Sequence, residues 1–310
     1  MLALIISGLV LFMSTIVRGL HPTVLVTGST GGIGLTTAKN MAAKGFHVIV
    51  HGRDTSRITK ACQTIRNFVR HSNTGIDSVE ADLSTIRGCE VLVERVKTLC
   101  RDKNLNLTVL MHNAGVFSER FVRTEDGFEL TFAVNVLAPF IITSLLLPEL
   151  LQQNRCRLVI ASSISQSSSI RDWDDIQFAK VPYSAHRAYS ESKLLDAMLA
   201  KEFADRLQAA GFGPDCITSN SLDPGTVNTK MLLAGWGPCG IDVEDALDET
   251  YLCTSDELEG VTGSYFTWRT ESRSNYPATE RKKMWAILSN LAPNAAAMWQ
   301  FDWNKKYQKY

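Results

Sequence analysis

The chain has 310 residues, 45% of them hydrophobic and 21% charged, a composition typical of a globular protein with one large core. It carries 32 lysine and arginine residues and 32 aspartate and glutamate residues, so the net charge is zero and nucleic acid is not expected as a partner. Seven scattered cysteines, without C-x-x-C spacing, predict free thiols in a cytosol-facing protein.

The chain begins with a hydrophobic run, MLALIISGLVLFMSTIV, that contains no charged side chain. Its length is close to the lower limit for crossing a bilayer. The first cation, Arg18, follows the run, so the positive-inside rule places the remaining chain in the cytosol, as in an enzyme anchored in the endoplasmic reticulum. We therefore expect residues 1–20 to be a membrane anchor. A buried helix is the first alternative. A signal peptide of a secreted or luminal protein comes after it, because no basic segment precedes the run.

Apolar β-branched runs then alternate with helical patterns. Strands are predicted at Thr23–Thr27, Phe46–His51, Ile76–Ala81, Leu107–His112, Arg157–Ser162 and Cys216–Ser221. Helices are predicted at Ile33–Lys44, Thr55–His71, Ser84–Asp102, Glu125–Gln153 and Arg187–Gly211. This order predicts an α/β fold over residues 21–292, with a single Rossmann-type, doubly wound parallel sheet and helices on both faces.

The pattern shortens after the sixth predicted strand. One more strand is predicted at Gly263–Phe266 and one more helix at Pro277–Leu291. Residues 293–310 form a tail of aromatic and basic side chains. Such a tail could dock on the domain or touch a membrane surface, and the sequence leaves both open.

A glycine-rich turn, TGSTGGIG at residues 27–34, joins the first strand to the first helix. Gly28 permits a tight turn, while Gly32 and Gly34 let a pyrophosphate approach the backbone at the helix N-terminus. Glycine patterns alone are weak evidence, but the strand–turn–helix context is the one that a dinucleotide site requires. We expect Ser29 and Ile33 of this turn to contribute to cofactor binding.

Arg53 follows the second strand, in VIVHGRD. An acidic residue at this position accepts the ribose 2′-hydroxyl of NAD, whereas an arginine accommodates the 2′-phosphate of NADP. Arg53 therefore favours NADP(H). Asp54 could pair with Arg53 or repel a phosphate, which leaves NAD(H) open.

Two later stretches also fit a cofactor site. Asp82 and Leu83 follow the third strand, where the carboxylate could accept from an adenine amino group. The alternative for Asp82 is a helix cap, for which Ser84 is the better residue. Asn113 and Ala114 follow the fourth strand, where small residues would let the chain pass beneath a cofactor.

Tyr189 and Lys193 are spaced i, i+4 in AYSESKLLDAM and share one helix face. A phenol with a pKa near ~10 is a poor acid or base at neutral pH, but a neighbouring lysine cation lowers that pKa. The pair can then supply the proton that a carbonyl oxygen needs when the carbon accepts hydride. The similar pair Tyr183 and Arg187 is rejected because it precedes the predicted helix proper.

Two further polar residues complete the candidate set. Ser163 ends the fifth strand, where its hydroxyl could hold the substrate oxygen beside Tyr189, and Ser162 is the competing candidate. Asn135 lies within an apolar helix, where an amide is costly unless it is hydrogen bonded. It could organise water toward Lys193 or simply satisfy backbone groups. The histidines lack ligand-spaced partners, so no metal site is expected.

Over nearly its whole length after residue 22, the chain resembles the short-chain dehydrogenase/reductase family. The resemblance rests on motifs that occur in the family's order: TGSTGGIG, NAG, Asn135, Ser163, Tyr189, Lys193 and PGTVNT. The resemblance implies that Ser163, Tyr189 and Lys193 are catalytic, that Asn135 supports them, and that Val227 and Thr229 lie near the nicotinamide. Departures from the family pattern include His112 before NAG and Ala138.

The segment between Ser163 and Tyr189, together with TEDGFELTFAVN, resembles the retinol-dehydrogenase-like branch. The resemblance implies an NADP(H)-dependent oxidoreductase for a small lipophilic carbonyl or alcohol, membrane association through the N-terminus, and a homodimer or an anchored monomer. A dinucleotide-binding sensor or scaffold with little catalysis is the alternative.

Overall fold

The computed structural model describes residues 22–272 and 276–307. The hydrophobic segment 1–20, predicted to be an anchor, lies outside the described residues. Within them, the helical stretch Leu130–Leu151 is long and apolar enough to cross a membrane, but most of it is buried inside the domain. It is therefore a core helix.

The sheet has eight strands in the order β3-β2-β1-β4-β5-β6-β7-β8. The strands are β1 Pro22–Val26, β2 His47–Gly52, β3 Ile76–Glu80, β4 Asn106–His112, β5 Cys156–Ala161, β6 Ile217–Asp223, β7 Tyr265–Thr267 and β8 Thr270–Ser272. Neighbouring strands are parallel from β3 to β7, and β8 pairs antiparallel with β7. The predicted doubly wound sheet is confirmed, while β8 is an addition, because three residues are too few to give a period-2 signal.

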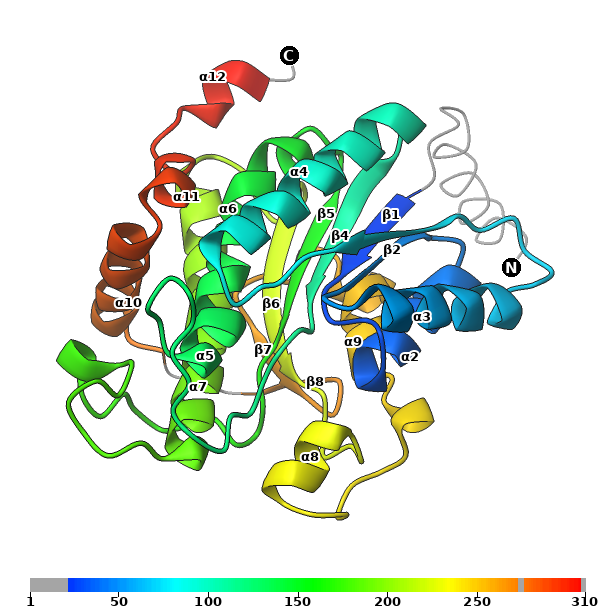
Figure 1. Ribbon diagram of the computed structural model, residues 1–310. Coiled ribbons are helices and arrows are strands. Elements are labelled where there is room, and N and C mark those ends of the chain that lie inside the picture. Colours follow the sequence, from blue (N-terminus) through cyan, green and yellow to red (C-terminus); the bar gives the residue numbers. More distant parts are fainter. Residues whose placement is uncertain (1–21, 273–275, 308–310) are drawn as a thin grey trace.

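Helices cover both faces of the sheet (Figure 1). One face carries α4 Ile86–Lys103, α6 Ala138–Leu151 and α7 Ala185–Ala209, and the other carries α2 Gly32–Ala43, α3 Thr55–Phe68 and α9 Asp248–Thr254. The remaining helices are α5 Leu130–Phe132, α8 Lys230–Gly235, α10 Ala278–Leu291, α11 Pro293–Ala297 and α12 Trp303–Tyr307. In Figure 1, α8 lies at the lower end of the sheet and α12 at the opposite end.

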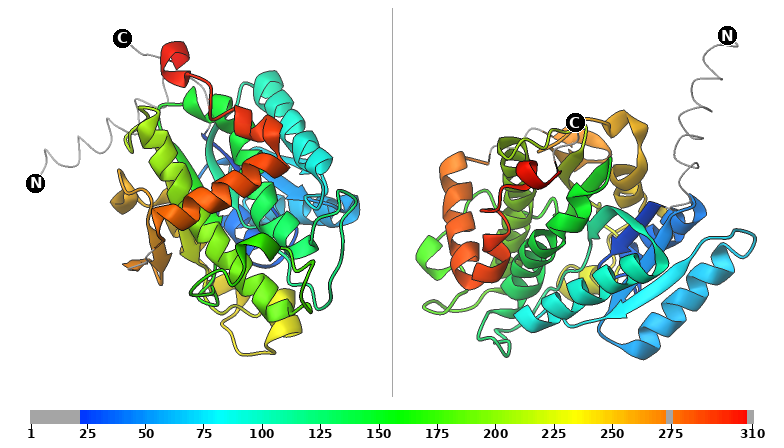
Figure 2. Two further views of the ribbon diagram at one scale, coloured as in Figure 1. Left: turned by 90° about the vertical axis from the view of Figure 1, so that its left-hand side faces the viewer. Right: turned by 90° about the horizontal axis from the view of Figure 1, so that it is seen from above.

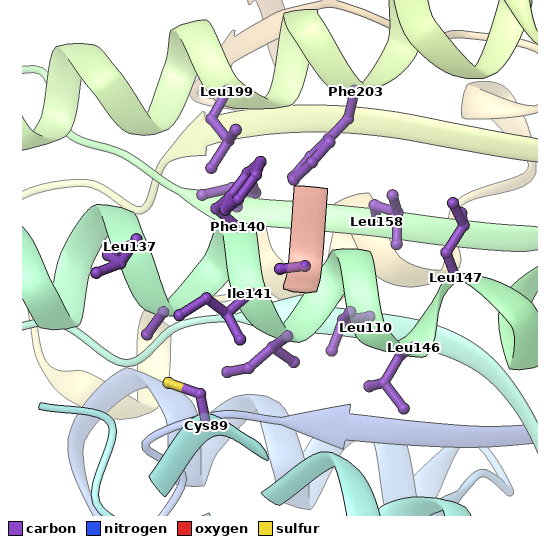
Figure 3. Packing of buried hydrophobic residues seen from close by; sticks show 14 of the residues in the cluster. Cys89, Leu110, Leu137, Phe140, Ile141, Leu146, Leu147, Leu158, Leu199 and Phe203 are labelled. Carbon is purple, nitrogen blue, oxygen red and sulfur yellow. The ribbon is translucent and has the colours of Figure 1, made fainter. Parts of the chain in front are cut away.

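The larger apolar core lies between the sheet and α6 and α7 (Figure 3). Phe140 of α6 and Phe203 of α7 are fully buried and lie near Leu158 of β5. Apolar side chains cover all sides of α6, a pattern typical of a buried helix. Accordingly, α6 is enclosed by α4, α7 and the sheet rather than lying on the surface. This packing fixes α7, which carries Tyr189 and Lys193, against the carboxyl ends of the strands.

The C-terminal segment docks on the domain, as one of the two alternatives for it supposed. Trp299 stacks on Phe203 with ring centroids 5.3 Å apart and donates a 2.7 Å hydrogen bond to Ser144 Oγ. Trp303 is buried. Figure 2 shows α10 and α11 lying across α6 and α7, so the chain covers the outer faces of its own long helices.

Three predicted helix starts are wrong, each because a capping side chain acts elsewhere. The helix expected from Glu125 begins at Leu130, because the Glu129 carboxylate accepts from the N–H groups of Thr131 and Phe132. The cap of α4 is Thr85 rather than Ser84. The cap of α7 is Ser184, which brings residues 185 and 186 into that helix.

Candidate active site

The glycine turn lies at the carboxyl end of β1, directly before α2. Gly28 and Gly32 have φ values of 66° and 59°, in the left-handed region that glycine adopts without strain. No side chain caps the start of α2, so its first N–H groups face outward from the turn. These are the features by which a helix N-terminus holds a phosphate.

The segment after β4 packs on the turn and leaves no room for side chains at Gly28 and Gly34. A Cβ added to Gly34 would lie 2.3 Å from Asn113 Nδ2, and one added to Gly28 would lie 2.8 Å from the Cα of Ala114. The Asn113 amide donates to the carbonyl oxygens of Thr27 and Gly28, at 2.7 and 3.2 Å. The structure thus brings together the predicted residues Gly28, Gly34, Asn113 and Ala114.

His51 supports this turn, a role that sequence reasoning missed. Its Nδ1 accepts from the Gly28 N–H at 3.0 Å, and its Nε2 lies 3.2 Å from the Ala81 carbonyl oxygen. Burial lowers the pKa of His51 to about 4, so the ring is neutral at pH 7, with Nε2 as the donor. The sequence shows a histidine at the end of β2. It does not show the partners of that histidine, which lie at the ends of two other strands.

Two arginines, Arg53 and Arg57, follow β2. Arg53 is exposed just after β2. Asp54 caps α3, because its carboxylate accepts a 2.8 Å hydrogen bond from the Arg57 N–H. The carboxylate that could pair with Arg53 is therefore also a helix cap. The Arg57 guanidinium lies 3.7 Å from the Cβ position of Gly31. Arg57, which the sequence reading did not select, therefore places a second cation against the glycine turn.

The other predicted cofactor residues divide into those whose side chains are at least partly exposed and those whose side chains are buried. Asp82 is exposed and accepts from Ser84 N–H, Ile33 is half-buried, and Thr229 lies 3.5 Å from the Cβ position of Gly32. Thr229 also caps α8. By contrast Ser29, Leu83 and Val227 are buried, and the Ser29 hydroxyl donates to the Val26 carbonyl. The side chain of Ser29 therefore stabilises the turn from beneath.

Ser163 and Tyr189 meet at the carboxyl end of β5. The Ser163 hydroxyl acts on the phenol and lowers the pKa of Tyr189, which is only 8% exposed. The competing Ser162 is buried, with its hydroxyl donating to the Lys193 carbonyl at 2.6 Å. Of the two serines, Ser163 is thus the one whose hydroxyl contacts the phenol.

Lys193 lies one helical turn after Tyr189 and is buried. Its Nζ is 5.7 Å from the centroid of the tyrosine ring and donates to the Ala161 carbonyl and the Asp196 carboxylate, each at 2.8 Å. The sequence predicts a lowered pKa for Tyr189. That prediction is wrong, because the pKa of Tyr189 in the folded protein is raised overall. Burial raises the pKa of Tyr189 more than the Lys193 cation lowers it.

Asn135 lies in a short π-helix, residues 133–137, between α5 and α6. Its side-chain oxygen accepts from Val116 N–H at 2.8 Å, and its amide donates to the Val116 carbonyl and to Ser192 Oγ. Asn135 thus satisfies backbone groups, one of the two roles left open. It ties the segment after β4 to α7, on which Tyr189 and Lys193 lie.

Three aromatic side chains, Phe117, His186 and Trp236, form what we term the aromatic wall. The ring centroids of Phe117 and Trp236 lie 5.8 and 5.5 Å from that of Tyr189, and His186 lies 5.2 and 5.0 Å from Phe117 and Trp236. Phe117 follows β4, His186 is in the first turn of α7, and Trp236 ends α8.

The pair Tyr183 and Arg187 forms no second site. The Tyr183 hydroxyl hydrogen bonds with the Ser118 carbonyl and the Glu129 carboxylate, while Arg187 lies 4.3 Å from the ring centroid of Phe178. All seven cysteines are free thiols, in agreement with the sequence reading.

The residues present fit a nicotinamide dinucleotide. We term the turn with Gly28, Gly32 and Gly34 the glycine cradle. An added Cβ at Gly28 or Gly34 would clash with the segment after β4, and the α2 N–H groups have no side-chain cap. Lys193 Nζ lies 3.6 Å from the Cβ position of Gly115, so the segment after β4 connects the cradle to the Tyr189 site. The arrangement can bind a phosphate-bearing cofactor beside an acid–base tyrosine.

Comparison with known proteins agrees with this geometry. Residues 22–234 match the short chain dehydrogenase family. Human retinol dehydrogenase 14 is 32% identical over 79% of this chain and 77% of its own length. Human polyprenol dehydrogenase is 31% identical, over 84% and 82%.

Solved structures share the fold. A protein from Mycobacterium paratuberculosis superposes with a TM-score of 0.69 at 24% identity, over 88% of this chain and 93% of that one. A 3-oxoacyl (acyl-carrier-protein) reductase from Agrobacterium tumefaciens, solved with NADP bound, gives a TM-score of 0.61 at 23% identity, over 80% and 92%. At these identities the likeness concerns the fold alone.

Proposed function

Since this chain belongs to the short-chain dehydrogenase family of oxidoreductases, we propose that it is an NADP(H)-dependent enzyme that interconverts a lipophilic carbonyl compound and its alcohol. The observation that carries the proposal is the placement of Ser163 and Lys193 beside Tyr189, together with the glycine cradle. These groups supply a positioned hydroxyl, a proton donor and a cation.

The roles of the residues follow from this arrangement. The nicotinamide, when bound, supplies or accepts the hydride at the substrate carbon. In reduction, the Tyr189 hydroxyl gives its proton to the carbonyl oxygen that Ser163 holds; in oxidation, the phenolate takes the proton from the alcohol. The Lys193 cation stabilises the phenolate in both directions. Asn135 holds the segment after β4 to α7 through its bonds to Val116 and Ser192.

The surroundings of Tyr189 support a lipophilic substrate. The aromatic wall lies against the phenol. Ile164, the residue after Ser163, and Leu233, on α8 just before Trp236, are exposed apolar side chains at 64% and 50%. Exposed apolar side chains gathered at a reacting group are typical of a site that binds an apolar molecule. Two similar proteins, a retinol and a polyprenol dehydrogenase, are named for isoprenoid alcohols. We propose a retinoid-like alcohol or aldehyde, or another long apolar carbonyl compound, as the substrate class.

Arg53 and Arg57 support the preference for NADP(H). Two guanidinium groups near the ribose end of the cradle suit a 2′-phosphate, and Asp54 is engaged in capping α3. The apolar residues 1–20 support membrane anchoring with the domain facing the cytosol, a location in which a lipid-soluble substrate is available.

The test is NADPH oxidation by the full chain in detergent micelles, with all-trans-retinal, medium-chain aldehydes, steroid ketones and quinones as substrates. Consumption that Tyr189→Phe abolishes, while NADPH still binds, supports the proposal. Turnover retained by Tyr189→Phe overturns the assignment of the proton donor. NADPH binding without turnover of any carbonyl would favour a dinucleotide-binding sensor or scaffold.

A further inference from the structure

The ammonium group of Lys193 is held by a buried carboxylate. Asp196 follows three residues later on α7, and its Oδ2 lies 2.8 Å from Lys193 Nζ. The two side chains are 5% and 1% exposed. A second bond, to the Ala161 carbonyl of β5, fixes the ammonium from the opposite element. Both contacts lie within the acid–base site.

Asp196 is itself only half satisfied. Its Oδ1 is buried and has no hydrogen-bond partner among the described residues. A buried carboxylate with one free oxygen is costly to ionise, and the Lys193 cation is the group that offsets this cost. The contact therefore couples the charge on Asp196 directly to the charge on Lys193.

The coupling extends to Tyr189. Lys193 favours the phenolate, whereas the negative charges of Asp196 and Asp223, the latter at the end of β6, oppose it. Glu249 of α9 is the further charged group that acts on Lys193, and its carboxylate accepts a 2.7 Å bond from Thr37. Burial raises the pKa of Asp196 to about 7, so above that pH its ionised carboxylate offsets part of the field with which Lys193 would acidify the phenol.

We propose that Asp196 is a positioning residue, which holds the Lys193 ammonium beside Tyr189 and offsets its charge there. The inference rests on the proposed function of Tyr189. In this arrangement the phenol stays protonated at neutral pH, which is the form that carbonyl reduction requires. The chain is thereby set toward reduction rather than alcohol oxidation at neutral pH.

The decisive variant is Asp196→Asn, which keeps an oxygen for Lys193 but removes the charge. We expect the midpoint of Tyr189 ionisation to fall by about one pH unit or more, the usual effect of an uncompensated neighbouring cation. The pH above which aldehyde reduction declines should fall with it. Asp196→Glu, which keeps the charge, should retain the midpoint of the unmodified protein.

The matched control is Asp205→Asn, because Asp205 also pairs with a lysine on α7, at 2.7 Å, but lies farther along the helix. The direct measurement is the tyrosinate absorbance of each variant minus that of the same variant carrying Tyr189→Phe. It needs no substrate, so it remains informative if the proposed function fails.

An unchanged Tyr189 midpoint in folded Asp196→Asn, or an equal shift in Asp205→Asn, would overturn the proposal. If Asp196→Asn does not fold, as judged by circular dichroism, Asp196→Ala takes its place with the same expected shift. A shifted midpoint in a protein that turns over no carbonyl compound would support the role of Asp196 and contradict only the proposed reaction.

Discussion

The backbone N–H of Gly28 donates a 3.0 Å hydrogen bond to Nδ1 of His51, which joins the glycine turn to the neighbouring strand. The other ring nitrogen lies 3.2 Å from the carbonyl oxygen of Ala81, at the end of β3. The bond from Gly28 requires the neutral ring, because a protonated Nδ1 cannot accept, whereas Nε2 donates to Ala81 in either protonation state. The shape of the cofactor cradle therefore depends on the protonation state of one buried histidine.

This dependence predicts a loss of stability in acid. The pKa of His51 is 6.5 ordinarily and about 4 in the folded protein. Above pH 6.5 the ring is neutral in both states; below it, the unfolded chain binds a proton that the folded chain rejects. The contribution of His51 to the free energy of unfolding is thus complete above pH 6.5 and is lost as pH falls toward 4.

The measurement is urea unfolding at pH 7.5 and pH 5, with His51→Gln as the comparison. The unmodified protein should lose about 2 kcal/mol more than the variant between these pH values. Other titrating groups, including His112 and the buried carboxyl groups, are common to both proteins and cancel in the difference. Equal losses in the two proteins would contradict the assignment.

A second prediction concerns Gly34. An alanine there would bring its Cβ to 2.3 Å from Asn113 Nδ2 and 2.8 Å from the Gly28 carbonyl oxygen, so the turn must shift. We expect Gly34→Ala to weaken NADPH binding at least about tenfold and to destabilise the fold by about 1–3 kcal/mol. NADPH fluorescence titration measures the affinity.

The control for that substitution is Gly213→Ala. A Cβ at Gly213 has no neighbour within 4 Å, and the residue lies far from the cradle in sequence, before β6. It should leave NADPH affinity unchanged. Comparable losses of affinity in the two variants would mean that the cradle around Gly34 is not the cofactor site.

The sequence was sufficient for features whose cause is local. Alternating apolar runs placed six strands, and the Gly28–Gly34 turn was found because strand, glycines and helix are contiguous. The start at Leu130 was missed because the choice between Glu125 and Glu129 depends on which carboxylate turns back to the helix N–H groups. That choice has no signature in residue type.

Contacts between distant segments were beyond the sequence. An aspartate such as Asp196, within a helix, ordinarily indicates a solvent-exposed face, and only the packing of α7 on β5 shows that it is buried against Lys193. His51 and Phe117 were missed for the same reason. Tyr189 was found by its spacing, but its pKa direction was wrong because spacing reports the neighbouring lysine and not the burial.

A third prediction separates the two cofactors. Arg53→Ser should lower NADPH affinity about tenfold or more, because it removes a cation suited to the 2′-phosphate, and leave NADH affinity nearly unchanged. Arg57→Ser should act in the same direction, since its guanidinium lies beside Gly31. Fluorescence titration with both cofactors provides the comparison within each variant. Parallel losses for NADPH and NADH would contradict a role in recognising the phosphate.

The last prediction concerns Trp236 of the aromatic wall. Its ring lies 5.5 Å from that of Tyr189 and 5.0 Å from that of Phe117, yet it remains 39% exposed, so one face is free to meet a substrate. Trp236→Ala removes apolar surface from the site but none of the groups that move a proton. It should raise KM for a long apolar aldehyde about tenfold, with a smaller change in kcat.

The choice of substrate and control makes this test specific. A short aldehyde, which buries less apolar surface against Trp236, should show a smaller change in KM with Trp236→Ala. Trp268→Ala, which removes a tryptophan that is 64% exposed and outside the aromatic wall, should leave KM for both aldehydes unchanged. Because Tyr189 is only 8% exposed beneath the wall, an equal loss of kcat for long and short aldehydes would instead assign Trp236 to holding the phenol in place.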